Sequence, residues 1–378
     1  MINKAFSNWG GVCMITISLC MIIKNEEDTL ARCLESVKGI PDEIILIDTG
    51  STDNTIHIAK QWTNNVYHLK WRDNFADARN YSFQKATKDY ILWLDADDVL
   101  QSTDYQKLVT LKQTLDPSVD MVSMVYHVFF DEYDNIATST KRYRLLKRKH
   151  NFQWHGRVHE DIVRPENMNC YDADIAIVHK KIKSSIVSVK RNLSIFENIL
   201  NEGRELTPNE MLNFAKDLHS INQYEKAIVW YEKYLSYQNI PRSHQIFAYQ
   251  GLAHCYDLIG NAERAIELIL QTLQYSLPQP FSCCRLGEYF FIKKQFRYAI
   301  FWYESATKFT DVHSFLLDQS AYRTWIPHQQ LGICYYELKD YDKAIKHFQH
   351  VLEYKSNHPE IIDSIETIHK EIEMYTLK

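Results

Sequence analysis

The sequence predicts a protein of two domains: an α/β domain with a mostly parallel sheet, followed by an all-α domain. The chain has 378 residues, which is more than one ordinary hydrophobic core accommodates. Up to about residue 180, apolar runs of strand length alternate with helical patterns. Beyond about residue 190 only helical patterns remain, and they repeat.

The first domain is expected at residues 15–185, after a short N-terminal tail at residues 1–14. Its predicted strands are, in chain order, ITISLCMII, EIILID, NVYHL and YILWLD. The helices predicted around them are EEDTLARCLESV, NTIHIAKQW and FADARNYSFQKA. Strands that are apolar along their whole length are typical of a parallel sheet with helices on both faces. Such sheets bind ligands at the carboxyl ends of their strands, where this chain places Asn25, Glu26, Asp48 and Asp95.

The second domain is expected at residues 186–378, where four segments share one pattern. Each has a small residue in its first helix and an alanine 12 positions later; the small residues are Ala215, Ala253, Gly287 and Gly332. Their spacings of 38, 34 and 45 fit a period of 34 with insertions of 4 and 11. This pattern resembles the tetratricopeptide repeat, and the alternative is an irregular helical bundle. Stacked repeats offer surfaces that bind peptides or proteins, and that also allow a homodimer.

Charge and cysteine content limit which binding partners and which cellular compartment we expect for this protein. A formal net charge of −5 gives no reason to expect nucleic acid or an anionic membrane as partner. The eight cysteines form no CxxC and mostly lie in apolar patterns, and no secretory leader or membrane-spanning run is evident. We therefore expect reduced thiols and a cytoplasmic location, with membrane contact limited to peripheral association.

Three carboxylates crowd the end of the fourth strand, in the stretch LWLDADD. Asp95, Asp97 and Asp98 repel one another behind an apolar strand, which costs folding energy unless a cation lies among them. An Asp-x-Asp pair can direct Asp95 and Asp97 at one point, where oxygen ligands suit Mg²⁺ or Mn²⁺. Such an ion can hold a diphosphate. The alternative is an acidic turn that caps the next helix.

Three further stretches carry polar residues suited to a phosphorylated ligand. Asp48 precedes the turn TGSTDNT and can accept a hydrogen bond from a base or ribose. Arg79, in FADARN, can reach a phosphate, or it can form a surface ion pair with a neighbour on its helix. Arg142 and Arg144 alternate in RYRLLKR, a predicted strand that places both on one face.

The stretch HGRVHED gathers histidine and acidic residues around one glycine. His159 can serve as a third metal ligand, and Glu160 or Asp161 can serve as a general base. A polar loop with a helix cap is the alternative.

Taken together, the motifs IIKNEED, EIILIDTGSTDNT, FADARN, LWLDADD and HGRVHED resemble those of family 2 glycosyltransferases, and they occur in that family's order. The resemblance covers residues 15 to about 165 and implies a GT-A fold, which is Rossmann-like. It also implies a UDP-sugar donor and Mg²⁺ or Mn²⁺. The helical repeats make the chain similar to glycocin-type (sublancin) peptide S-glycosyltransferases, which implies a peptide or protein acceptor. The linkage atom (S, O or N) and the sugar stay open.

The resemblance also assigns roles to single residues. Asp48 would contact the base, Asp95 the ribose and the metal, and Asp97 would bind the metal directly, with Asp98 as neighbour. His159 would complete the metal or diphosphate shell, and Arg79 or Arg144 would stabilise the leaving group. Glu160 would be the base, with Asp161 as rival, because the Gln-x-x-Arg-Trp stretch that follows the base in many relatives is not evident here.

The implied reaction is an in-line displacement that inverts the configuration of the sugar and transfers it to a side chain held by the repeats. Two alternatives remain. The acceptor could be a surface glycan or a lipid-linked precursor, or the chain could be an inactive repeat scaffold.

Overall fold

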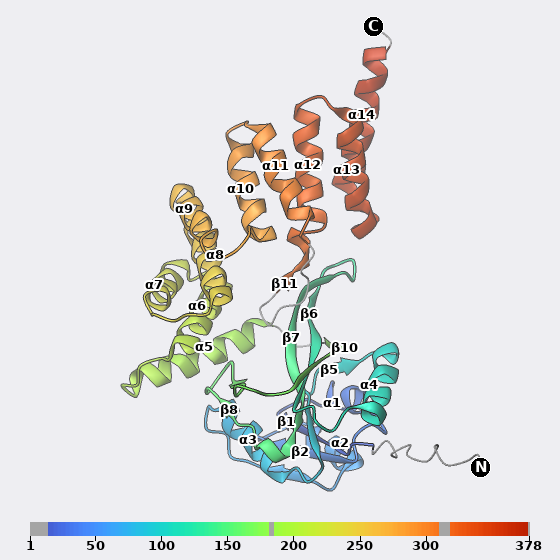
Figure 1. Cartoon of the computed structure of the whole chain (residues 1–378), viewed down its shortest axis with the longest axis vertical. Helices are drawn as coiled ribbons and strands as arrows, with labels where there is room; N and C mark the ends of the chain where they lie inside the picture. Colours follow the sequence, from blue (N-terminus) through green and yellow to red (C-terminus); the bar gives the residue numbers. More distant parts are fainter. Residues whose placement is uncertain (1–13, 181–184, 310–317, 377–378) are drawn as a thin grey trace, which may run out of the picture. The chain divides into compact units, whose positions relative to one another are not determined.

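The computed structural model describes residues 14–180, 185–309 and 318–376 (Figure 1). Contacts divide the chain into two compact units. The first comprises Met1–Tyr126 and Lys141–Ser184, and the second comprises His127–Thr140 and Ser185–Lys378. Cys13 and nearly all of the predicted N-terminal tail lie outside the described residues. No helix among the described residues is long and apolar enough to cross a membrane.

The strands of the first unit follow the apolar runs of the sequence. In chain order they are β1 Ile17–Ile23, β2 Glu43–Asp48, β3 Val66–His68, β4 Tyr90–Trp93, β5 Asp98–Leu100, β6 Met121–Phe130, β7 Ile136–Lys147, β8 Trp154–His155, β9 Asp161–Ile162 and β10 Cys170–His179. The main sheet has the order β3-β2-β1-β4-β7-β6-β10-β5. Strands β3, β2, β1 and β4 are parallel, whereas β7 joins β4 antiparallel and β10 joins β5 antiparallel. The sheet is therefore parallel where the sequence predicted it, with an antiparallel extension.

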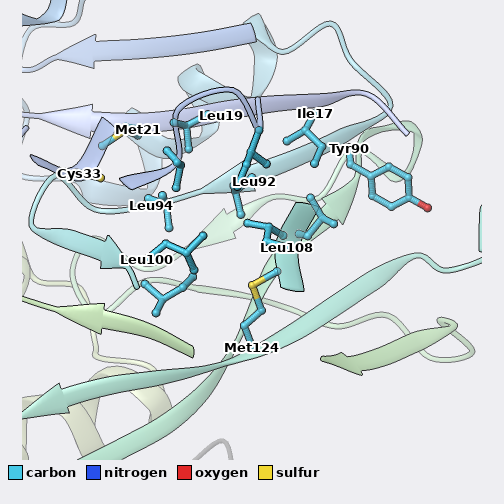
Figure 2. Packing of buried hydrophobic residues seen from close by; sticks show 14 of the residues in the cluster. Ile17, Leu19, Met21, Cys33, Tyr90, Leu92, Leu94, Leu100, Leu108 and Met124 are labelled. Carbon is cyan, nitrogen blue, oxygen red and sulfur yellow. The ribbon is translucent and has the colours of Figure 1, made fainter. Parts of the chain in front are cut away.

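Helices pack on both faces of the parallel strands. They are α1 Leu30–Ser36, α2 Thr55–Trp62, α3 Phe75–Lys85 and α4 Ser102–Thr114, and a 3-10 turn, η1, covers Arg148–His150. Because side chains alternate along a strand, Leu19 and Met21 of β1 join one core with Leu108 of α4, and Cys20 joins another with Phe83 of α3. Figure 2 shows part of the first core. Two buried faces explain the continuously apolar strands.

The second unit is built from paired helices that stack side by side (Figure 1). They are α5 Ser185–Asn201, α6 Pro208–Ser220, α7 Tyr224–Leu235, α8 Arg242–Leu258, α9 Ala262–Thr272, α10 Pro280–Ile292, α11 Phe296–Thr307, α12 Trp325–Glu337, α13 Tyr341–Tyr354 and α14 Pro359–Thr376. The pairs α6–α7, α8–α9, α10–α11 and α12–α13 coincide with the four predicted segments. The repeat period thus identified each pair correctly.

Small residues allow the paired helices to approach closely. A Cβ atom added to Gly287 would lie 2.6 Å from the ring of Tyr303, and one added to Gly332 would lie 2.6 Å from the ring of Phe348. Real Cβ atoms do not come so near, so these positions admit only glycine unless the ring moves. Tyr303 and Phe348, four places after Ala299 and Ala344, are buried and fill the space that these two glycines leave.

The second unit also includes the ends of two strands, residues 127–140. There β7 pairs with β11 Asp318–Gln319, which the 3-10 turn η2 Ser320–Tyr322 follows. Asn135 Nδ2 donates to the carbonyl oxygen of Tyr354 at 2.6 Å. Lys355 is 3.3 Å from Glu132, and its ammonium group lies 3.7 Å from the ring centroid of Trp325. No pattern in the sequence indicates that this segment packs with the repeats.

Candidate active site

The carboxyl ends of β1 and β2 lie side by side, since Ile23 pairs with Asp48 in the sheet. Asp48 is 2% exposed and accepts backbone N–H groups from Gly50 at 3.1 Å and Ser51 at 3.0 Å. Its carboxylate is also 3.2 Å from Nδ1 of His68. Burial alone would raise the pKa of Asp48, but these hydrogen bonds lower it below its usual value. The structure therefore holds an ionised acceptor at the predicted ligand-binding edge.

Asn25 and Glu26 join the loop after β1 to the loop after β2. Asn25 has a φ of 54°, and its side-chain oxygen accepts the N–H of Thr52 at 2.7 Å. The backbone N–H of Glu26 donates to the hydroxyl of Thr55 at 2.6 Å. Both residues thus lie at the predicted edge, where they shape the loops.

Each carboxylate of the acidic cluster meets a different cation of the protein. Asp95 accepts Nη2 of Arg79 at 2.7 Å, and Asp98 accepts Nη1 of Arg144 at 3.0 Å. The carboxylate of Asp97 is 3.3 Å from Nδ1 of His179. The cation that the crowded carboxylates require is therefore present within the chain itself.

The buried side chain of Asp98 stabilises the turn at residues 95–98. Its side chain is 0% exposed, and besides Arg144 it accepts the backbone N–H of Asp95 at 2.9 Å and the hydroxyl of Tyr126 at 2.8 Å. Asp97 differs, because 18% of its side chain is exposed. Asp98 is therefore a structural acceptor, whereas the side chains of Asp97 and of Asp95, which is 32% exposed, are both partly open to solvent.

The pKa shifts follow from these pairs. Burial would lower the pKa of His179, but hydrogen bonds and charges from Asp97 and Asp98 raise it to about 10. Burial would raise the pKa of Asp95, but Arg79, Arg144 and His179 lower it. Asp95 is thus ionised and His179 protonated at neutral pH.

Helix α3 positions the loop that carries HGRVHED through three contacts. The backbone N–H of Phe75 donates to the carbonyl oxygen of Arg157 at 2.8 Å, and the Asn80 side chain bonds both the N–H and the carbonyl of Trp154. Nε of Arg79 donates to Oε1 of Glu160 at 2.5 Å. Phe75, Arg79 and Asn80 of FADARN therefore hold this loop. Arg79 also bridges Glu160 to Asp95.

The two candidate bases differ in their surroundings. The side chain of Glu160 is 9% exposed and joins the Arg79–Asp95 network. Asp161 is exposed and accepts its nearest hydrogen bond from the backbone N–H of Ile162 at 2.8 Å. Only Glu160 of these two is linked through Arg79 to the acidic cluster.

Within the described part of the chain, one group of three residues brings ligand atoms within 4.8 Å of one another: Asp97, Asp98 and His179. The structure does not bring the predicted ligands Asp95 and His159 into this group. Asp95 faces Arg79 instead, and His159 lies on the HGRVHED loop with a φ of 50°. His179 was missed because its position depends on the pairing of β10 with β5, which sets it opposite Asp98. A histidine that ends an alternating apolar run was the one available signal.

Residues 18–176, which contain most of the sheet and all of the described site residues except His179, match the family model described as glycosyl transferase family 2. These residues form a family 2 glycosyltransferase domain. Residues 327–358, which contain α12 and α13, match the tetratricopeptide repeat model. The prediction of a glycosyltransferase domain joined to tetratricopeptide repeats is confirmed, and so is the predicted fold class.

Three proteins are similar to parts of this chain. Two curated relatives, the SPbeta prophage-derived glycosyltransferase SunS of Bacillus subtilis (strain 168) and glycosyltransferase SunS of Bacillus phage SPbeta, are each 30% identical over 230 residues. The match covers 58% of this chain and 53% of each relative, so the chain spans about half the length of these relatives. A crystal structure of glucosyl-3-phosphoglycerate synthase from Mycobacterium tuberculosis, in complex with Mn²⁺, UDP-glucose and glycerol 3-phosphate, is 22% identical with a TM-score of 0.27; the match covers 33% of this chain and 51% of that chain.

Proposed function

We propose that this protein is an inverting, metal-dependent glycosyltransferase that moves a sugar from a UDP-sugar to a peptide or protein side chain bound by the repeats. The observation that carries the proposal is the bridge from Glu160 through Arg79 to Asp95, beside Asp97 and His179. It sets a carboxylate suited to proton transfer next to a group suited to a divalent cation. Both functions accelerate glycosyl transfer to a hydroxyl or thiol.

The residues present fit a divalent cation. Asp97 and His179 offer an oxygen and a nitrogen 3.3 Å apart. Adjacent ligands of an octahedral ion at ~2.1 Å lie about 3 Å from each other. Asp97 and His179 would hold the ion, with Asp98 behind them. When bound, the cation supplies positive charge that stabilises the leaving diphosphate. Because Asp97 and Asp98 raise the pKa of His179 to about 10, His179 would have to release its proton to act as a ligand, and the cation would take over the charge of that proton.

The chain's own residues account for the remaining steps. Asp48 and the joined loops at Asn25 and Glu26 bind the base and ribose, since an ionised carboxylate accepts an N–H or O–H group. Arg79 fixes Oε1 of Glu160, so Oε2 accepts the acceptor's proton. The acceptor atom bonds to the anomeric carbon as the bond to the diphosphate breaks on the opposite face, and the configuration inverts.

The first test uses the full chain with a panel of UDP- and GDP-sugars, with Mn²⁺, Mg²⁺ or EDTA, and measures release of the nucleotide. We expect release from a UDP-sugar only with metal, and a fall of about 100-fold or more in Asp97→Asn. The exposed carboxylate of Asp174 provides the control variant, Asp174→Asn. Release with no metal, or an Asp97→Asn variant as active as the control, contradicts the metal assignment. No release in any condition favours the scaffold alternative.

The acceptor is assigned to the first helices of the repeats, where side chains from successive pairs meet. Lys216 of α6 lies 5.5 Å from the ring centroid of Phe247 on α8. The ring of His254, also on α8, lies 6.2 Å from that of Phe281 on α10. Half-buried aromatic rings beside polar groups suit a peptide, since they give contact area at low entropic cost.

The acceptor assignment predicts a split between two activities. Phe247→Ala and Phe281→Ala should lower transfer to a peptide acceptor while leaving hydrolysis of the sugar nucleotide unchanged. Tyr298→Ala, which truncates an exposed ring on α11, is the matched control. Equal loss of transfer and hydrolysis would overturn the assignment. Transfer to a glycan or lipid-linked acceptor in place of peptides would support the first alternative.

A further inference from the structure

Two arginines that pair with the acidic cluster contact the same tryptophan. The guanidinium carbon of Arg144 lies 3.9 Å from the ring centroid of Trp93, and that of Arg79 lies 5.0 Å from it. Tyr126 adds a second ring at 4.4 Å from Arg144, and Trp154 adds one at 4.8 Å from Arg79. The rings of Trp93 and Trp154 meet edge to face at 4.8 Å. Cations and aromatic rings thus form one continuous cluster.

Arg144 depends on these rings because its hydrogen bonds are incomplete. It is 0% exposed, and its Nη1 binds Asp98 and the carbonyl oxygen of Trp93. Its Nε and Nη2 have no hydrogen-bond partner in the structure. A fully buried guanidinium with two unpaired N–H groups is costly, and aromatic faces offset part of that cost by cation–π attraction. The rings therefore determine where Arg144 holds Asp98.

The orientation of Trp93 is itself fixed. Its indole N–H donates to the carbonyl oxygen of Tyr143 at 2.7 Å, and its side chain is buried, with 6% of the residue exposed. It lies in β4, two residues before Asp95. Trp93 is thus a rigid ring between the sheet and both arginines.

We propose that Trp93 is a positioning residue of the active site, whose ring holds Arg79 and Arg144 where they orient Glu160, Asp95 and Asp98. The expected effect on reaction rate rests on the proposed function, whereas the expected position of the two arginines does not. A side chain of equal hydrophobicity without a ring would fill the core and lose the cation–π contacts. The arginines would then shift, and the carboxylates would shift with them. Misplacement of catalytic groups by about 1 Å costs roughly 100-fold in rate.

The structural test records nitrogen–proton NMR spectra of the arginine Nε–H groups in the full chain without ligand. Arg79→Lys and Arg144→Lys serve only to assign the two signals. We expect both signals shifted by the aromatic rings in the wild type, retained in Trp93→Phe and lost in Trp93→Leu. Unchanged signals in Trp93→Leu would overturn the proposal. Trp62→Leu is the matched control, because Trp62 also contacts a cation, Lys38 at 5.6 Å, but on α2.

The kinetic test compares the same variants in nucleotide release. Trp93→Leu should lower kcat about tenfold or more through Glu160, with a smaller rise in KM for the sugar nucleotide through Asp95 and Asp98. Trp93→Phe should restore most of the rate. A Trp93→Leu rate equal to that of Trp62→Leu would overturn the positioning role. If the wild type releases no nucleotide, the proposed function fails, and the NMR spectra alone decide whether Trp93 positions the arginines.

Discussion

At the scale of single residues, three adjacent carboxylates have three different roles. Asp95 and Glu160 both pair with Arg79. Asp97 lies beside His179 at a partly exposed position. Asp98 is buried and pairs with Arg144. Repulsion within LWLDADD predicted a cation, and the protein supplies positive charge from three side chains. A metal ion bound by His179 would therefore replace the proton that His179 carries, rather than fill a site without positive charge. Because the three carboxylates have different partners, substitutions at or beside them should have different effects.

The buried ion pair makes one such difference measurable. Arg144→Gln leaves the carboxylate of Asp98 buried without its cation, which should lower the free energy of unfolding by ~3–5 kcal/mol. Urea unfolding of the full chain measures this loss. Arg148→Gln, at an exposed position nearby, should change stability little. The double variant Arg144→Gln/Asp98→Asn should recover part of the loss, and a loss equal to that of Arg144→Gln alone would contradict the role of charge.

The choice of base is a second prediction at this scale. Glu160→Gln should lower kcat roughly 10²–10⁴-fold, because the amide cannot accept the acceptor's proton. Asp161→Asn should stay within a few-fold of the wild type, since Asp161 is exposed and outside the Arg79 network. Steady-state transfer kinetics measure both, with melting temperatures as a check on folding. The reverse ranking of the two variants would make Asp161 the base.

At the scale of elements, local patterns predicted what local forces determine. The apolar run Ile91–Leu94 gave β4, and the spacing of Gly287 and Gly332 gave the helix pairs. Contacts set by distant strands were not predictable. His179 reaches Asp97 only because β10 pairs with β5, and Arg144 reaches Asp98 only because β7 adds to β4. A single sequence carries no record of such pairing, so His179 and the ion pair between Arg144 and Asp98 were missed.

The close helix pairs predict the cost of one methyl group. Gly287→Ala should destabilise the second unit by ~1–3 kcal/mol, because the new Cβ would overlap the ring of Tyr303, which is 1% exposed and cannot move away. Thermal unfolding measures this change. Tyr303→Leu replaces the ring with a smaller side chain. In that background, adding Gly287→Ala should change the free energy of unfolding little. Strict additivity of the two substitutions would show that the ring is not the cause.

Histidine pairs within the repeats predict sensitivity to acid. His219 and His254 lie 3.1 Å apart, and His328 and His347 lie 2.9 Å apart. Burial, followed by the neighbouring charges, lowers the pKa of all four, to about 4 for His219 and for His347. The unfolded chain binds protons near pH 6.5 and the folded chain only near pH 4, so stability present above pH 6.5 falls as the pH drops toward 4. Melting temperatures between pH 7.5 and 4.5 test this, and His219→Gln/His347→Gln should flatten the curve.

At the scale of the whole molecule, ligand linkage and acid linkage should act on different units. A ligand that binds only the folded state stabilises it by RT ln(1 + [L]/Kd), about 2.7 kcal/mol at 100 times Kd. The candidate site draws on β2, β4, α3 and β10 of the first unit, whereas the histidine pairs lie in α6, α8, α12 and α13 of the second.

Hydrogen exchange followed by mass spectrometry can report both units in one intact chain. UDP with Mn²⁺ should slow exchange in peptides of the first unit, and neither alone should match the effect. Lowering the pH to 5 should speed exchange in the repeats. Equal protection by UDP without metal would contradict the assignment of a divalent cation to the site. Acid effects confined to the first unit would mean that the histidine pairs do not control stability.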